Sequence, residues 1–162
     1  MLEISKNSYI SREYADEYIS SRYRSNSKDR KRWEELSKED KEILLINACD
    51  ELERLQWQGR TVTKGQAMAF PRLPFQYGRT EEIAPLRVKQ AQTELALWLS
   101  DDTRQSKLSK RQELQSQGVE SFSIGDLSES YGEGVGEKSA PLLCLKVKNL
   151  ISPYLNGGVD IC

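Results

Sequence analysis

Residues 37–59 read SKEDKEILLINACDELERLQWQG and carry the clearest helical pattern of the chain. Ser37 is a favoured N-cap residue, and acidic residues follow it in the first turn, where they interact well with the positive end of a helix dipole. Gly59 is well placed to end the helix. Between these ends, apolar residues recur at helical spacing, at Leu45, Ala48, Leu52 and Leu55. The stretch therefore predicts an amphipathic helix over 38–57.

The same spacing of apolar residues appears in two other stretches. Ser11 is a suitable N-cap for a first helix over 12–23. Pro85 suits the first position of a third helix over 85–100. We expect the three helices to share one core, formed by Tyr18, Leu45, Ala48, Leu52, Leu55, Val88, Ala91, Leu95 and Trp98.

The segments between and after these helices predict loops and one hairpin. Pro71 and Pro74 interrupt the region that follows Gly59, so we expect a short helical turn and a packed loop there. Residues 119–131 alternate apolar and polar side chains around a Gly-Asp turn signal, which predicts a β-hairpin. Residues 101–117 are polar and form either a solvated helix or an ordered arm.

The fold class expected from these patterns is mainly α: a small helical bundle with one β-hairpin and extended C-terminal elements. We expect a helical core over 1–100, an extended arm with the hairpin over 101–140, and a C-terminal helix and tail over 141–162. Because a two-stranded hairpin is marginal alone, it must pack on a helix, pair with another chain's strand, or project as an arm.

The composition of the chain excludes several classes of chemistry. It has no histidine, so Ser-His-Asp and Cys-His catalysis are impossible. Its three cysteines are far apart and form no C-x-x-C pair, so we expect no zinc site and read them as free thiols in a reducing compartment. No glycine-rich phosphate loop is present. We therefore expect no enzyme, no metal and no cofactor, and the apolar stretches are too short to predict a membrane span.

Opposite charges lie side by side in the N-terminal third of the chain. Residues 22–32 contain six basic side chains and one acidic one, whereas residues 34–42 contain five acidic and two basic ones. The formal net charge of the whole chain is only −1. The basic window is a solvated face, an intersubunit contact with a neighbour's acidic window, or a single-strand binding footprint interleaved with Tyr18 and Tyr23. The candidate intersubunit residues are Arg22, Arg24, Arg30, Lys31, Arg32, Glu34, Glu35 and Glu39.

A series of short motifs resembles a known family. The most specific is QAMAFPR over 66–72, which matches a Q-A-x-A-W-P-R motif with Phe70 in place of the tryptophan. Before it stand Y-I-S over 9–11 and L-x-W-x-G over 55–59, and after it comes V-x-x-A-x-x-E-L-A over 88–96. In this order the motifs resemble the head-to-tail connector (neck adaptor) proteins of tailed bacteriophages, whose members are often labelled DnaT-like single-stranded-DNA-binding proteins.

The resemblance implies a virion protein of the neck, assembled in the host cytoplasm as a homo-oligomeric, commonly twelve-fold ring at the portal vertex. The ring would be a conduit for genomic double-stranded DNA, without catalysis and without a membrane. Its partners would be the portal protein and a downstream neck or tail-terminator protein. The candidate partner-docking residues are Leu108, Leu114, Phe122, Ile124, Tyr131, Leu150 and Tyr154.

Two other functions stay open at this point. The DnaT-like label predicts a single-stranded-DNA-binding protein that uses residues 18–32. An enzyme would have to work with carboxylates or tyrosine alone.

Overall fold

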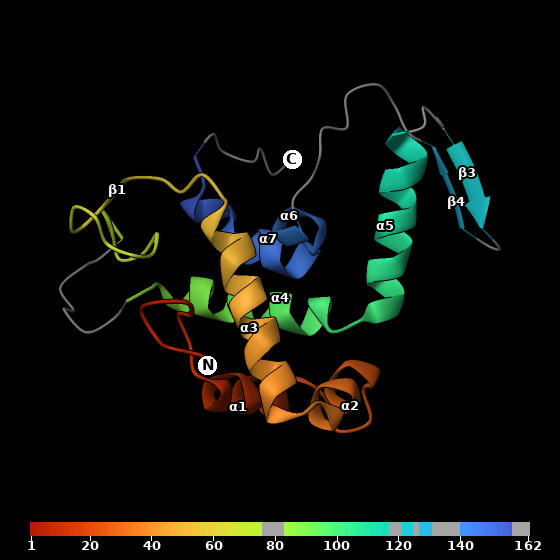
Figure 1. The fold of residues 1–162 in the computed structure, drawn as a ribbon, viewed down its shortest axis with the longest axis horizontal. Coiled ribbons are helices and arrows are strands. Elements are labelled where there is room, and N and C mark those ends of the chain that lie inside the picture. Colours follow the sequence, from red (N-terminus) through yellow and green to blue (C-terminus); the bar gives the residue numbers. More distant parts are fainter. Residues whose placement is uncertain (76–82, 117–120, 125–126, 131–139, 157–162) are drawn as a thin grey trace.

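Four helices cross one another to form the core of the computed structural model, which describes residues 1–75, 83–116, 121–124, 127–130 and 140–156 (Figure 1). Helices α3 (Lys38–Glu53) and α4 (Leu86–Leu99) pack against each other at its centre. Helix α1 (Arg12–Arg22) contacts both of them, and α7 (Leu145–Ile151) lies along α4. The mainly helical class expected from the sequence is confirmed.

Serine side chains start three of the helices. The Oγ of Ser11 accepts a hydrogen bond from the Tyr14 N–H at 3.1 Å, and Ser37 Oγ accepts one from the Asp40 N–H at 3.0 Å. The predicted starts of α1 and α3 are therefore confirmed. Ser27 caps α2 (Lys28–Glu35) in the same way, a helix that the sequence did not predict because Trp33 is its one buried apolar residue.

Helix α3 ends at Glu53, so the expected helix over 38–57 is four residues too long. The chain turns there because the indole of Trp57 folds back and its Nε1 donates to the Leu52 carbonyl at 3.0 Å. The same ring packs edge-on against Phe70, with 4.9 Å between ring centroids. Capping and aromatic packing of Trp57 thus replace the last helical turn.

Most of the predicted core is buried. Six of its nine residues have exposed fractions near zero, and Tyr18, Leu55 and Trp98 are half-buried at its margin. No sequence pattern indicated a role for Gln92, a fully buried polar residue of α4. Its Oε1 accepts from the Tyr9 N–H at 3.0 Å, and its Nε2 donates to Ser8 Oγ at 2.7 Å and to the Leu45 carbonyl at 2.9 Å. Gln92 therefore ties the N-terminal segment to the two central helices.

The loop after α3 holds a small antiparallel pair of strands, β1 (Arg60–Thr61) and β2 (Arg72–Leu73), instead of the expected short helical turn. The Arg72 guanidinium donates to the carbonyls of Gln58 at 2.9 Å and Gly59 at 2.7 Å. Gln66 Nε2 donates to two further carbonyls of the loop. These side chains satisfy the carbonyls that a helical turn would otherwise have paired.

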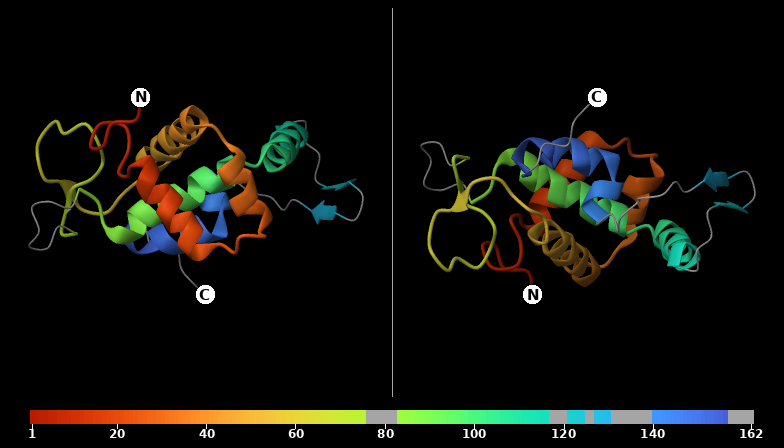
Figure 2. Two further views of the ribbon diagram at one scale, coloured as in Figure 1. Left: turned by 90° about the horizontal axis from the view of Figure 1, so that it is seen from below. Right: turned by 90° about the horizontal axis from the view of Figure 1, so that it is seen from above.

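An arm leaves the core at the end of α4. Helix α5 (Asp102–Ser116) turns away from α4, and the hairpin of β3 (Ser121–Ile124) and β4 (Leu127–Ser130) lies beyond it, apart from the helical core in all three views (Figures 1 and 2). The register pairs Ser121 with Ser130 and Ile124 with Leu127. The predicted hairpin is confirmed, and the polar segment 101–117 is helical over most of its length.

The C-terminal helix is part of the core. After the short α6 (Ala140–Leu143), α7 buries Val147 and Ile151 against α4, and the 3-10 turn η1 (Ser152–Tyr154) follows. An isolated bridge pairs Trp57 with Leu155. The elements that the sequence analysis placed apart as a C-terminal region thus complete the four-helix packing. None of the helices described is both long and apolar enough to traverse a lipid bilayer.

Candidate functional site

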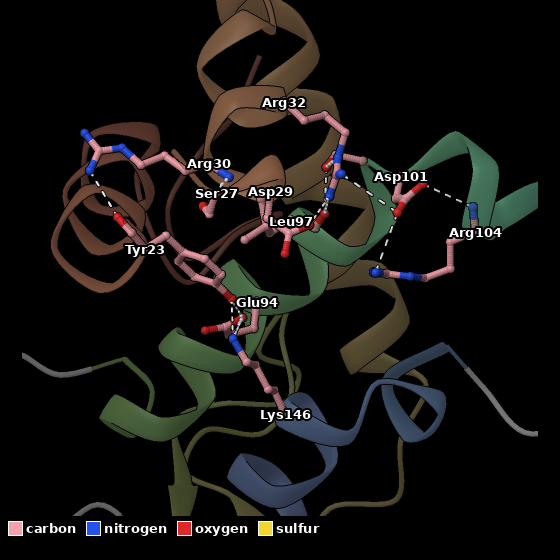
Figure 3. A network of polar contacts seen from close by, with 11 residues as sticks. Tyr23, Ser27, Asp29, Arg30, Arg32, Glu94, Leu97, Asp101, Arg104 and Lys146 are labelled. Carbon is pink, nitrogen blue, oxygen red and sulfur yellow. Dashed lines mark hydrogen bonds and ion pairs between the residues drawn. The ribbon is translucent and has the colours of Figure 1, made fainter. Parts of the chain in front are cut away.

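A pocket of about 200 Å³ opens where the α1–α2 junction, the end of α4, the start of α5 and the start of α7 meet. Its walls combine aromatic, apolar and charged side chains from segments that are far apart in the sequence. The residues that matter most for its chemistry are Tyr23, Asp29, Glu94, Trp98, Arg104 and Lys146. The polar contacts around it are shown in Figure 3.

The buried carboxylate of Glu94 is the centre of this site. It accepts hydrogen bonds from the hydroxyls of Tyr18 at 3.0 Å and Tyr23 at 2.5 Å. Burial, and then the negative charge and hydrogen bonding of Glu94, raise the pKa of both phenols above their ordinary value. Both tyrosines therefore stay protonated donors throughout the physiological pH range.

Lys146 closes the cluster from the C-terminal side. Its Nζ donates to the Tyr23 hydroxyl at 2.6 Å and lies 4.4 Å from the centroid of the same ring. The distance from Nζ to the Glu94 carboxylate is 3.7 Å, and 62% of the Lys146 side chain is exposed. The contact joins α7 to the end of α1 (Figure 3), and much of the Lys146 side chain stays exposed.

A second group of charges lines the other side of the pocket. Arg32 donates to Asp29 at 2.6 Å and to Ser100 Oγ at 2.9 Å, and it lies 3.8 Å from Asp101. Arg104 lies 3.6 Å from Asp101 and 5.5 Å from the centroid of the Trp98 ring. Arg32 therefore links α2 to the end of α4, whereas the ion pair between Arg104 and Asp101 is longer than a hydrogen bond.

The basic window divides into cations that serve the fold and cations that do not. Arg30 pairs with Glu34 at 2.7 Å and donates to the carbonyls of Ser20 and Tyr23, and Arg32 is held as described above. Four other cations are exposed, and in the described part of the chain none of them pairs with a carboxylate. We call these four the basic corner: Arg22, Arg24, Lys28 and Lys31.

The acidic window lies at the other end of α2. Glu35 ends this helix and Glu39 lies in the first turn of α3, and both side chains are exposed. Glu34 forms an ion pair with Arg30. Lys28 stands at the beginning of α2, so charges of opposite sign mark its two ends. The structure thus separates the two windows by the length of one short helix.

The predicted docking residues are scattered over the molecule. Leu108 and Leu114 belong to α5, and Phe122 and Ile124 belong to β3. Leu150 and Tyr154 are half-buried near the end of α7, where the Tyr154 ring packs against Phe75 with 4.9 Å between centroids. Tyr131 lies outside the described residues.

Four charged residues of the pocket were not predicted as site residues: Asp29, Glu94, Arg104 and Lys146. One signal for Glu94 was available, because it is a carboxylate in the middle of an apolar helix. Arg104 and Lys146 stand in ordinary polar sequence, and only the tertiary fold brings them together.

Reactive groups are few in the described residues. No group of three or more Cys, Asp or Glu residues there is arranged to hold a metal ion. Burial raises the pKa of the Cys49 thiol to about 12 and also raises the pKa of the Cys144 thiol. Both cysteines are therefore poor nucleophiles. The arrangement is suited to binding through charge and aromatic surface.

A family model described as "Putative DnaT-like ssDNA binding protein" matches residues 3–161. The chain belongs to this family. The match to the DnaT-like family includes the core, the arm and every residue of the pocket. No curated protein and no solved structure matches the chain. The match agrees with the DnaT-like label and does not name a connector, so the connector role stays a prediction.

Proposed function

We propose that this DnaT-like protein binds single-stranded DNA and that the basic corner is its contact with the phosphates. The observation that carries the proposal is the exposure of four neighbouring cations that have no described acidic partner, beside the half-buried rings of Tyr18 and Tyr23. Cations that are already paired would have to give up an ion pair to bind a phosphate. The cations of the basic corner can bind a phosphate without breaking an ion pair. The description of the family supports the same ligand.

The strength of such binding depends on salt in a calculable way. Each phosphate of a single strand that a cation neutralises contributes about −0.7 to the slope of log K against log salt. A strand that contacts all four cations would therefore show a slope of about −3. The net charge of −1 means that attraction comes from the local cluster and not from the molecule as a whole.

Fluorescence anisotropy with a labelled 15-nucleotide strand, measured in a salt series, tests this proposal. Replacing the four cations of the basic corner with serine should bring the salt slope close to zero. A matched control removes the same charge from four exposed cations elsewhere: Arg60, Lys64, Lys107 and Lys110. The control should keep the slope of the wild type. Equal losses in both variants would show that binding is non-specific attraction and would overturn the assignment to the corner.

A second candidate function is the head-to-tail connector, a ring between portal and tail that passes genomic double-stranded DNA. Two observations favour it. Lys28 and Glu35 place opposite charges at the two ends of α2, which offers complementary patches for a head-to-tail contact between identical subunits. The arm of α5 and the hairpin also stands away from the core, where another chain can reach it (Figure 1). Neither function requires catalysis.

A charge swap distinguishes the two candidates. Lys28→Glu with Lys31→Glu should prevent ring assembly on isolated portal rings, and adding Glu35→Lys with Glu39→Lys should restore it. Light scattering after gel filtration measures the assembly, with Arg60→Glu and Lys64→Glu as the matched control. If the corner serves DNA alone, the swap changes strand affinity and leaves assembly untouched. Arg30 and Arg32 are kept because they hold the fold together.

A further inference from the structure

We infer that the pocket beside the basic corner receives one base of the bound strand, and that this base carries an exocyclic amino group, as cytosine and adenine do. The inference rests on the proposed function. The pocket and the corner share the α1–α2 junction, because Tyr23 lies between Arg22 and Arg24 in the chain and Asp29 follows Lys28. We therefore place the strand so that its backbone follows the corner and one base reaches the pocket.

The size of the pocket suits one base. Pockets that enclose whole drug-sized ligands measure roughly 300–1,000 Å³. This pocket, at about 200 Å³, is smaller than that range. It can take a single planar ring system and not a stack of several. The rest of the strand must then lie outside it, along the corner.

The walls of the pocket offer stacking surfaces. The rings of Tyr23 and Trp98 contribute to them, together with the apolar side chain of Leu97. Arg104 lies over the Trp98 ring, and a planar guanidinium stacks on a base as an aromatic ring does. Base stacking on such groups is independent of sequence, so it supplies affinity without preference.

Two cations at the pocket can donate hydrogen bonds to a phosphate. Lys146 and Arg104 lie 3.7 Å and 3.6 Å from their acids, which is beyond ordinary hydrogen-bond length, and their side chains are 62% and 38% exposed. Both side chains therefore keep N–H donors available for a phosphate. The carboxylates inside the site have closer hydrogen-bond partners than these two cations, because Glu94 accepts from two phenols and Asp29 accepts from Arg32 at 2.6 Å.

The preference for an amino group follows from Asp29. This carboxylate lines the pocket and uses Oδ1 for Arg32, while its Oδ2 has no hydrogen-bond partner among the described residues. A carboxylate oxygen accepts from the N4 amino group of cytosine or the N6 amino group of adenine. Thymine carries the O4 acceptor at the position of this amino group, so it can reach the same oxygen only through its N3 imino N–H, in a different orientation. The site should therefore discriminate against thymine.

The test compares a 15-nucleotide thymidine strand with the same strand carrying one central dC, by anisotropy at fixed salt. One added hydrogen bond predicts a preference of about fivefold for the dC strand. Asp29→Asn should reduce the preference to less than twofold, because an amide both donates and accepts. Trp98→Leu should weaken both strands, and circular dichroism with thermal melting verifies that each variant is folded.

A second measurement does not depend on substitution. A strand with 5-iodocytosine at its centre should crosslink to Tyr23 or Trp98, as located by mass spectrometry of the digested protein. Equal affinity for the two strands together with crosslinks elsewhere would overturn the pocket while leaving the basic corner intact. If no strand binds at all, both the proposed function and this inference are wrong. Binding that depends on the corner but shows no preference refutes the inference alone.

Discussion

The hydroxyl of Tyr23 donates a 2.5 Å hydrogen bond to Glu94, a residue 71 positions further along the chain. Tyr18 donates to the other oxygen of the same carboxylate. Lys146 donates to Tyr23 in turn, so segments from both ends of the chain meet at one buried acid. The end of α1, the middle of α4 and the start of α7 are therefore positioned by one cluster.

Replacing Glu94 with glutamine should lower the free energy of unfolding by about 2 kcal/mol, because one carboxylate oxygen becomes an NH2 group that cannot accept from a phenol and the other becomes a neutral amide acceptor. Urea denaturation followed by circular dichroism measures the change. Glu39→Gln is the matched control at an exposed position and should stay within about 0.5 kcal/mol of the wild type. A loss no larger than that of the control would show that the cluster contributes nothing to stability.

The tyrosines of this cluster predict a loss of stability at alkaline pH. The folded protein raises the pKa of Tyr18 and Tyr23, so their contribution is complete below the ordinary tyrosine pKa, near 10, and decreases as pH rises above it. The unfolded chain releases these protons first. Urea melts between pH 9 and 11 should show the decline, and Tyr23→Phe should make it shallower. A slope that Tyr23→Phe leaves unchanged would contradict the prediction.

Gly59→Ala should be strongly destabilising. Gly59 has a φ of 75°, and a Cβ atom at this position would lie 1.8 Å from the carbonyl oxygen of Leu73. The β1–β2 pair would have to separate, at a cost of about 2 kcal/mol or more. Gly65 is the matched control, because it has a φ of 79° and nothing within 4 Å of its added Cβ.

Gly65→Ala should lower the free energy of unfolding by only about 1 kcal/mol, which is the cost of placing alanine in a left-handed backbone conformation. Thermal melting of the two variants measures the difference. Similar melting temperatures for Gly59→Ala and Gly65→Ala would mean that the close approach to Leu73 is relieved at little cost.

Gln92→Leu should lower the free energy of unfolding by about 3 kcal/mol, since it leaves the Tyr9 N–H without its buried acceptor and removes the Nε2 hydrogen bonds to Ser8 Oγ and the Leu45 carbonyl. Hydrogen exchange at the Tyr9 amide is the direct readout, and it should become much faster. Gln90→Leu, on the half-buried side of the same helix, is the control. Unchanged protection of Tyr9 would show that the amide has another acceptor.

Local signals in the sequence were enough to predict the main helices and the hairpin. Ser11 and Ser37 start their helices as expected, because capping depends on neighbouring residues only. The end of α3 was missed because it depends on Trp57 meeting Phe70. Helix α2 was missed because its charged sequence has no apolar stripe and its one buried ring, Trp33, is held by Asp16 of α1.

The site was only partly predictable for the same reason. The basic window was evident from composition, but the sequence could not separate Arg30 and Arg32, which bind backbone carbonyls and Ser100, from the cations that stay exposed. Those partners come from distant segments of the chain. Glu94, Arg104 and Lys146 belong together only after α4, α5 and α7 have been placed.

The packing of α7 against α4 makes the core depend on two helices that are far apart in the sequence. Val147 and Ile151 of α7 fill the centre of the helical core. Without them, α4 exposes the apolar surface that they cover. A chain cut before α7 therefore lacks part of its core and exposes a surface that favours aggregation.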